Sequence, residues 1–325
     1  MGSAGAEEQT VRSLAQETTP VENAPNLSDW LGIELRIKRD DYYPMSGGGN
    51  KARKIRYILR AAIEKGHDAI VTNGGVQSNH ARAAALACAA GRLQCRLVLH
   101  GDPSRPYPLT GNLLLMKLAG AQIEIVPIER LGEAMDEAVS ECRRAGLNPL
   151  YVWGGGHCLE GSLAYRDAAG EFQSQQADWK PDFVVLASGT GTTQAGLHVG
   201  FASSPACVVG VSVARDRERG MAVVQESVKE LACHLGSTAH KDIVFRDDWI
   251  CGGYEQFDEE ILDILDMAAR LDGLILDPTY TGKAFRGLVD MVGSGFIPRR
   301  SKVLFWHTGG LLNLTASEHF LSRHL

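Results

Sequence analysis

Helical patterns alternate with short apolar stretches along most of this chain. Residues 53–66 carry apolar side chains three and four positions apart and stop at Gly66, and the run 69–72 that follows has the composition of a buried strand. The same pairing recurs downstream, with strands expected at 95–100, 122–126 and 150–153 and helices at 79–91, 109–120 and 129–146. This alternation predicts parallel sheets covered by helices.

The alternation is interrupted at WGGGHCLEG, residues 153–161, and then resumes. Further strands are expected at 182–188, 207–213, 274–277 and 302–307, with helices opening at 189–197 and spanning 222–236 and 258–273. We therefore predict an α/β protein with two open, mostly parallel twisted sheets. The boundary is placed near residues 153–161, which gives a small domain of residues 55–161 and a large domain of residues 1–54 plus 162–325.

Composition narrows the class of protein. A chain of 325 residues with 44% hydrophobic side chains is long enough to bury a substantial core in one large or two medium domains. The net charge of −6 argues against a nucleic-acid surface. No apolar stretch approaches the roughly 20 residues that span a bilayer, and residues 1–19, with Glu7 and Glu8, read as a loose lead-in rather than a presequence.

The seven cysteines indicate a reducing compartment. Their number is odd and no CxxC pair occurs, so neither a disulfide framework nor a zinc site is predicted. Several lie in apolar runs such as LACAAG, where reduced thiols pack as small hydrophobic groups. We expect a cytoplasmic protein without a metal ion.

The stretch SGGGNKARK, residues 46–54, raises a chemical question, because three glycines stand directly before Asn50 and Lys51. Glycine allows unusual backbone angles and close approach to a ligand. A lysine amine can carry charge, contact a phosphate or form a Schiff base with a carbonyl compound.

A second glycine-rich loop follows a buried strand in VVLASGTGTTQAGL, residues 184–197. Backbone N–H groups at a helix N-terminus together with small hydroxyl side chains form an anion site, which we favour over a plain strand–helix turn. The loop lacks the lysine of a P-loop, departs from GxGxxG and has no clear acidic ribose ligand, so a nucleotide phosphate is disfavoured.

Three more polar loops follow apolar strands. VTNGGVQSNH ends in Gln77, Ser78, Asn79 and His80 at the start of a helix, where a helix N-cap explains one residue but not the cluster. LDPTYTGKAF and WHTGGLL have the same form. Ligands of open α/β sheets bind at such strand ends. A phosphate loop and a lysine on separate segments suggest pyridoxal phosphate.

These motifs resemble those of the fold-type II pyridoxal-phosphate enzymes, the tryptophan synthase β-like superfamily, and within it the D-cysteine desulfhydrase and 1-aminocyclopropane-1-carboxylate (ACC) deaminase family. GGNKARK, GGVQSNHAR, SGTGTTQAGL and DPTYTGKA stand in the family order, and the likeness runs from about residue 35 to WHTGG. The resemblance implies a homodimer with the cofactor in the cleft between a large cofactor-binding domain and a small domain.

The resemblance also implies roles for residues in the matched motifs. Lys51 would form the Schiff base and carry protons, and Asn79 would hydrogen-bond the cofactor's ring hydroxyl. Ser78 would lie beside the substrate and would either contact its carboxylate or assist proton transfer. Tyr280, and Tyr254 in CGGYEQF, would be active-site tyrosines. The cofactor phosphate would be bound by Gly189, Thr190, Gly191, Thr192 and Thr193. Lys54, one helical turn after Lys51, would either face the cleft or be a surface lysine.

Two positions bear on the reaction. ACC deaminases carry glutamate after the DP-x-Y tyrosine and leucine in the final H-x-GG motif, whereas this chain has Thr281 and Thr308, the desulfhydrase-like pattern. A carboxylate beside the pyridine nitrogen would favour its protonated form, whereas the Thr281 hydroxyl would donate a hydrogen bond to an unprotonated nitrogen. The prediction is β-elimination from a β-substituted amino acid, foremost D-cysteine to pyruvate, ammonia and hydrogen sulfide.

Alternatives remain open. Trp153 and His157 lie in a loop that could border the substrate, which leaves room for L-cysteate, for a larger amino acid, for β-replacement and, less so, for ACC. A dinucleotide-dependent oxidoreductase would leave Lys51 unexplained. A non-catalytic cofactor carrier would not need both tyrosines.

Overall fold

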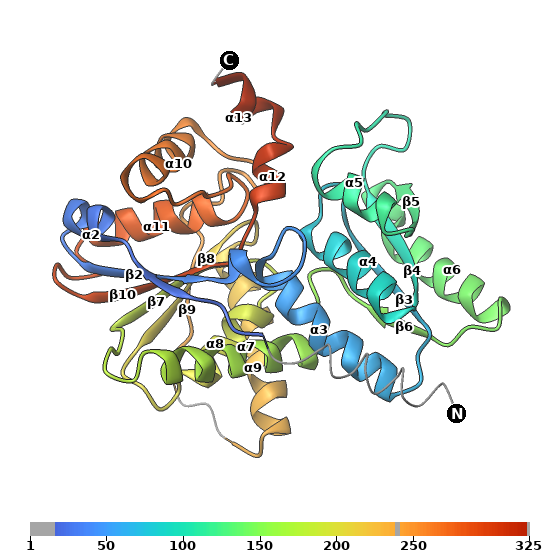
Figure 1. Cartoon of the computed structure of the whole chain (residues 1–325), viewed down its shortest axis with the longest axis horizontal. Coiled ribbons are helices and arrows are strands. Elements are labelled where there is room, and N and C mark those ends of the chain that lie inside the picture. The colour runs from blue at the N-terminus through green and yellow to red at the C-terminus, as the bar shows by residue number, and fades with distance from the viewer. Residues whose placement is uncertain (1–16, 238–240, 324–325) are drawn as a thin grey trace.

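The computed structural model describes residues 17–237 and 241–323, in which two sheets form two lobes (Figure 1). The large sheet has the order β1-β2-β10-β7-β8-β9 and is parallel except for β1, which runs antiparallel to β2. Its strands are β1 (Val21–Asn23), β2 (Glu34–Arg39), β7 (Phe183–Ser188), β8 (Cys207–Ser212), β9 (Val244–Arg246) and β10 (Lys302–His307). The small sheet is fully parallel in the order β5-β4-β3-β6, with β3 (Ala69–Gly75), β4 (Gln94–His100), β5 (Gln122–Val126) and β6 (Pro149–Val152). The predicted α/β architecture with two mostly parallel sheets is confirmed.

Helices cover the sheets. The α-helices are α2 (Pro25–Leu31), α3 (Gly49–Glu64), α4 (Asn79–Gly91), α5 (Gly111–Leu118), α6 (Leu131–Arg144), α7 (Leu159–Gln175), α8 (Thr192–Gly200), α9 (Arg217–His234), α10 (Glu259–Asp272), α11 (Thr281–Gly293), α12 (Leu311–Thr315) and α13 (Glu318–Arg323). Two short 3-10 helices, η1 (Asp40–Tyr42) and η2 (Ile128–Arg130), precede α3 and α6. Among the helices of the described residues, none combines the length and apolar composition needed to cross a membrane.

Strand β7 shows why the central strands are apolar at most positions. Val185 and Ala187 pack on the face covered by α10 and α11, whereas Val184 and Leu186 pack on the face covered by α7 and α8. Successive side chains of a strand point to opposite faces, so a strand buried on both faces is apolar at most positions, and in β7 only its last residue, Ser188, is polar.

One predicted strand is wrong. Residues 274–277 run extended but pair with no strand of the described chain. Leu274 and Leu276 are buried in the core while Ile275 is exposed, which reproduces the alternation of a strand without its hydrogen bonds. β10, whose His307 side chain bonds the Ile275 carbonyl, already has β2 and β7 on its two sides, so no sheet edge is free there.

Several elements carried no prediction, and the most important is α7. It packs against α8 of the large lobe and against α3, which also contacts α4 of the small lobe. The chain was predicted to pass from the large domain to the small domain between residues 54 and 55, and this point lies inside α3. The division into two domains therefore stays a prediction. Residues 1–16, most of the predicted lead-in, lie outside the described residues.

A buried ionic cluster fixes the start of α3. Arg53 donates to Asp40 of η1 (2.7 and 3.1 Å) and to Glu171 of α7 (2.6 Å). Burial alone would raise the pKa of Asp40, but the charge of Arg53 and its hydrogen bonds hold that pKa below the usual value. Lys51 is two residues from Arg53 on the same helix, so this cluster positions the lysine that the sequence singled out.

Candidate active site

The glycine run before Lys51 is required by close packing. A Cβ on Gly48, whose φ is +45°, would lie 1.9 Å from the Asp41 carbonyl oxygen. A Cβ on Gly49 would lie 2.8 Å from the Thr308 carbonyl oxygen. The loop therefore fits between η1 and the loop after β10, and the backbone N–H of Asn50 donates to the Thr308 carbonyl (3.0 Å). Glycine here allows α3 to begin against another backbone.

Lys51 points from the first turn of α3 toward the loop after β6. Its Nζ donates to the carbonyl of Gly155 (3.1 Å). Burial, together with the nearby charge of Arg215, lowers the pKa of the Lys51 amine to about 8. A substantial fraction of the amine is then neutral near physiological pH, and only the neutral amine can attack a carbonyl carbon.

Lys54 is a second buried amine beside the first. It is 1% exposed, so the surface alternative is excluded, and its Nζ donates to the Gly155 carbonyl (3.3 Å) and to the Thr192 hydroxyl. Burial, then the charge of Lys51, lowers the pKa of Lys54 well below its usual value. Within residues 17–237 and 241–323, neither amine forms an ion pair with a carboxylate. Two buried amines without a carboxylate partner, whose charged forms burial disfavours, indicate that an anion belongs here, because an anion beside them would restore their charge.

The loop from Gly189 to Thr193 provides the rest of an anion site. It joins the end of β7 to α8, which begins at Thr192, and Gly191 precedes the helix with φ of +87°. The first N–H groups of a helix have no partner within the helix. The Thr190 hydroxyl is buried without a hydrogen-bond partner, whereas the Thr193 hydroxyl accepts from Asn50 (3.1 Å). These groups fit a phosphate with Lys54 beside it.

The glycine-rich loop WGGGHCLEG closes the phosphate end. A Cβ on Gly155, whose φ is +79°, would lie 2.7 Å from Thr190 Cγ2 and 3.3 Å from Lys51 Nζ. His157 Nδ1 lies 2.8 Å from the Thr190 carbonyl oxygen. The sequence left open that the loop carrying His157 borders the substrate, and in the structure His157 contacts the loop from Gly189 to Thr193. Trp153, at the start of the loop, is exposed and stacks on Tyr151.

Ser78 and Asn79 lie where β3 gives way to α4. The Ser78 hydroxyl caps α4 by accepting from the Ala81 N–H (3.2 Å). The Asn79 side chain donates to Asn313 and accepts from Asn112 (3.1 Å), which links α4 to α5 and α12. An amide has two donor hydrogens, so Asn79 keeps one N–H for a ligand.

Tyr254 and Tyr280 meet at their hydroxyl groups, which share a hydrogen bond, and their rings pack edge to face with centroids 6.0 Å apart. Burial is the main cause that raises the pKa of each phenol, so both are protonated at neutral pH. The loop that carries Tyr254 is held by Lys283, whose Nζ donates to the carbonyls of Val213, Ile250 and Gly253 (2.8–2.9 Å). Lys283 stood in the quoted motif TGKA but carried no predicted role.

Thr281 differs from its predicted role. Its hydroxyl donates to Asp277 Oδ1 (2.8 Å) and accepts from the Asp277 N–H (2.9 Å). A hydroxyl has one proton, so in this arrangement Thr281 has none to donate to an unprotonated ring nitrogen. Thr308 is buried in the loop after β10 beside Gly49, at the position that its motif predicted.

His80 lies behind the two lysines and was named in the sequence only as part of a cluster. Its Nε2 is 2.8 Å from the Thr72 hydroxyl, and its Nδ1 is buried without a partner. Burial, then the charges of Lys51 and Lys54, lowers the pKa of His80 well below its usual value, so the imidazole is neutral.

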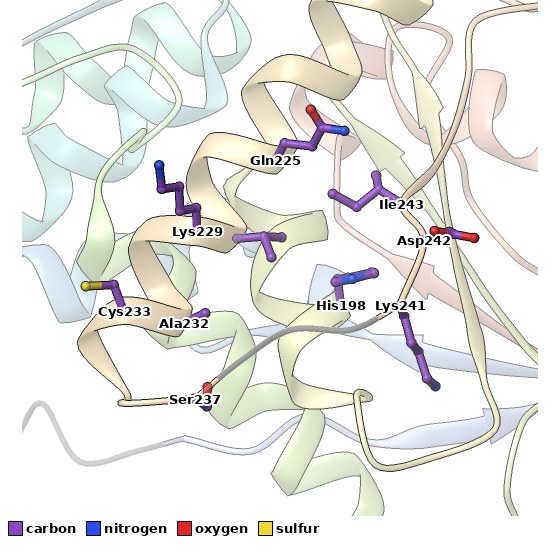
Figure 2. Close-up of a pocket in the computed structure, with 10 residues that line it drawn as sticks. His198, Gln225, Lys229, Ala232, Cys233, Ser237, Lys241, Asp242 and Ile243 are labelled. Atoms are coloured by element: carbon purple, nitrogen blue, oxygen red, sulfur yellow. The ribbon is translucent and has the colours of Figure 1, made fainter.

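A separate cavity of about 580 Å³ lies between α8, α9 and the segment at residues 241–243 (Figure 2). Lys241 points away from α9, and its Nζ is taken by the carbonyls of Phe201, Ser204 and Ala206. His198 is buried in the wall. None of the predicted site residues lines this cavity, and we assign it no role in the chemistry.

The described residues contain no group of three His, Cys, Asp or Glu side chains placed to hold a metal ion. All seven cysteines are free thiols, three of them buried.

Comparisons with known proteins agree with the site. The family model described as "Pyridoxal-phosphate dependent enzyme" matches residues 12–309. The solved structure of an ACC deaminase homologue is 35% identical with a TM-score of 0.87, and 94% of each chain is covered.

Two more distant structures share the fold. The processed form of threonine deaminase isoform 2 from Solanum lycopersicum is 18% identical with a TM-score of 0.63, covering 97% of this chain and 88% of that one. A hydrogen sulfide-producing enzyme from Fusobacterium nucleatum is 16% identical with a TM-score of 0.64, covering 92% and 97%. With two buried amines converging on a phosphate loop, these matches confirm that the chain belongs to the fold-type II pyridoxal-phosphate dependent enzymes and that its cofactor is pyridoxal phosphate.

Proposed function

We propose that this enzyme is a carbon–sulfur lyase that performs β-elimination on a β-substituted amino acid, with D-cysteine as the first candidate and pyruvate, ammonia and hydrogen sulfide as products. The observation that carries this proposal is position 281. A threonine stands where ACC deaminases carry glutamate, and its hydroxyl is closed onto Asp277, so no carboxylate side chain at this position faces the ring nitrogen.

The residues support a division of labour. Pyridoxal phosphate supplies an aldehyde that captures amines and a ring that withdraws electrons from the α-carbon. Lys51 would hold the aldehyde carbon and, as a neutral amine, would be the first candidate to accept the α-proton, with Ser78 or Tyr280 as the alternative acceptor for a D-amino acid. Lys54 and the loop from Gly189 to Thr193 hold the phosphate. The hydroxyl pair of Tyr254 and Tyr280 is protonated and can donate a proton to the departing sulfur.

The relatives support the coarse class and leave the substrate to experiment. One 35% identical structure is an ACC deaminase homologue, and one structure with the same fold is a hydrogen sulfide-producing enzyme. An enzyme with β-elimination chemistry would also cleave β-chloroalanine or O-acetylserine, which carry good leaving groups.

The test uses the holoenzyme with D-cysteine, L-cysteine, L-cysteate, D-serine and ACC, each followed by pyruvate and, where relevant, sulfide formation. We expect sulfide and pyruvate in equal amounts from D-cysteine. Formation of 2-oxobutyrate from ACC without any pyruvate from cysteine would overturn the proposal. We also propose a cytoplasmic homodimer, which light scattering on the purified protein tests for its oligomeric state.

A further inference from the structure

A cavity of about 430 Å³ lies beside the candidate active site, at the carboxyl ends of β3 and β4. Its walls come from the small lobe at Gly75–Gln77, from His100 and the loop at residues 101–110, and from the large lobe at Glu255. The carboxyl ends of parallel strands are where open α/β sheets bind ligands. The cavity is within the usual size range of small-molecule sites.

The cavity shares its walls with the residues proposed for catalysis. The Ser78 N–H donates to the carbonyl of Gly75 (3.0 Å), and Gly75 lines the cavity. The His100 ring lies edge-on to the Tyr254 ring with centroids 6.5 Å apart, and Glu255 is the next residue in the chain. A group attached to the β-carbon of a substrate held between Ser78 and Tyr254 therefore has this cavity as its nearest free volume.

The carboxylate of Glu255 and the guanidinium of Arg105 line the cavity, and among the described residues no ion pair joins them. Glu255 Oε1 and His100 Cε1 lie 3.7 and 3.3 Å from the point where a Cβ of Gly75 would stand, so both converge over the Gly75 backbone. Glu255 adopts a φ of +62°, which costs free energy in a non-glycine residue. Among the described residues Glu255 forms no hydrogen bond or ion pair.

Arg105 lies in the small-lobe loop at residues 101–110 and carries the charge opposite to that of Glu255 in the large lobe. Its guanidinium lies over the Tyr107 ring, 5.5 Å from the centroid, and its charge helps Ser104 to lower the pKa of Asp102. Within the part of the chain that the structure describes, the Arg105 side chain forms no hydrogen bond or ion pair. His100 has its pKa lowered by burial and is neutral, and the phenols of Tyr254 and Tyr280, which also lie near Glu255, are protonated.

We propose that this cavity is the leaving-group subsite and that the substrate class is a β-substituted amino acid whose substituent ends in both an ammonium and a carboxylate, as in a thioether that joins two amino acids. Glu255 binds the ammonium and Arg105 binds the carboxylate. The inference rests on the proposed β-elimination and extends it, since the thiol group of cysteine alone leaves most of a 430 Å³ cavity unfilled.

The reaction balances without an oxidant or reductant. The bond between the α-carbon and its proton breaks, and its electron pair becomes the double bond between the α-carbon and the β-carbon. The bond between the β-carbon and sulfur breaks with its electron pair on sulfur, and the sulfur takes a proton and leaves as the thiol of the second amino acid. The remaining three-carbon enamine takes up one water and yields pyruvate and ammonia.

The experiment compares kcat/KM for lanthionine with kcat/KM for S-propylcysteine, whose substituent has similar length but no charge, using both enantiomers of each centre. We expect kcat/KM for lanthionine to exceed that for S-propylcysteine by more than about tenfold in the wild type. This ratio should fall about tenfold in each of the single variants Glu255→Gln and Arg105→Gln, which is the effect of losing one charged contact. Exposed control variants Glu230→Gln and Arg144→Gln should keep the ratio. Using a ratio cancels any general loss of folded enzyme.

A ratio near one in the wild type, or the same ratio in all four variants, would show that the cavity is only a solvent channel and would overturn the inference while leaving the β-elimination standing. If no amino acid gives pyruvate, the proposed function fails separately. The subsite can then still be tested from the dissociation constants of the same two compounds, read from the visible absorption of the bound cofactor. Equal affinities for both compounds there would overturn the subsite as well.

Discussion

The two ends of the active site are built in opposite ways. At the phosphate end, backbones approach so closely that a single Cβ on Gly155 would overlap Thr190, and Lys54 is almost completely buried. At the substrate end, an open cavity is lined by exposed side chains, and Glu255 accepts a backbone conformation that glycine would adopt more easily. A phosphate is the same in every turnover, so glycine and backbone N–H groups suit it. Discrimination between substrates needs side chains, which differ in charge and shape.

The largest expected effect comes from the residue that serves both ends. Replacing Lys51 by Ala removes the amine that we propose as the holder of the aldehyde and as the first candidate for the α-proton base, so turnover of every substrate should fall by at least about 10³-fold. The visible absorption of the bound cofactor should change with it. Lys65→Ala, at the exposed C-terminal end of α3, is the matched control and should keep both. Near-normal pyruvate formation by the Lys51 variant would disprove the assignment.

The pH dependence of cofactor attachment tests the environment of the same amine. The folded-state pKa of Lys51 is lowered to about 8, so the neutral amine predominates above that pH and becomes about tenfold scarcer for each unit below it. The rate at which pyridoxal, which carries no phosphate, reacts with the apoprotein should follow the same curve, measured by absorbance in a stopped-flow mixer. A rate that still rises tenfold per unit up to pH 10 would indicate an ordinary lysine.

Replacing Lys54 tests its effect on phosphate binding separately from its effect on the stability of the fold. In Lys54→Met the dissociation constant for pyridoxal phosphate should rise about tenfold or more, because one charged contact to the phosphate is lost. The apoprotein should become more stable by about 1–2 kcal/mol, since folding no longer has to bury an amine that is charged in the unfolded chain. Cofactor titration and urea unfolding of the apoprotein measure the two changes. An apoprotein that instead loses stability would mean that Lys54 is compensated by an anion of the protein itself.

The smallest effect compares two glycines that differ only in their surroundings. Gly155 and Gly146 have φ of +79° and +81°, but nothing lies within 4 Å of a Cβ on Gly146. Both alanine variants should lose about 1–2 kcal/mol of stability from the backbone conformation. Gly155→Ala should lose about 1–3 kcal/mol more and should weaken cofactor binding, because its methyl group overlaps Thr190. Equal unfolding midpoints for the two variants would show that the structure around Gly155 can move to accept a methyl group despite the short distance to Thr190.

The phosphate end was predictable from sequence for a local reason. Gly189 to Thr193 stands directly between a buried strand and a helix, so the stretch of chain that forms the loop also carries its signal. Lys51 and Asn79 lie on helices that begin at such loops. The sequence could not decide whether Lys54 faces the cleft or the solvent, because the burial of Lys54 depends on the loop after β6.

The substrate end gives no comparable signal. His100 ends β4 and Glu255 lies in an irregular loop of the other lobe, so their convergence over Gly75 depends on how the two lobes pack. The hydrogen bond of the Thr281 hydroxyl was missed for a different, local reason. Its partner Asp277 is only four residues away, but the proton assignment follows from a turn in which Asp277 also accepts from the N–H groups of Thr279 and Tyr280.

The order of strands in the large sheet has a consequence for how the enzyme is made. β10 follows every other strand in the sequence but lies between β2 and β7. During synthesis the small sheet is complete once β6 has emerged, whereas the large sheet remains in two unjoined pieces until residues 302–307 leave the ribosome. Until then β2 and β7 each present an unpaired edge, the kind of surface that recruits other chains. The nascent chain therefore carries its greatest risk of aggregation late, just before its last strand closes the sheet.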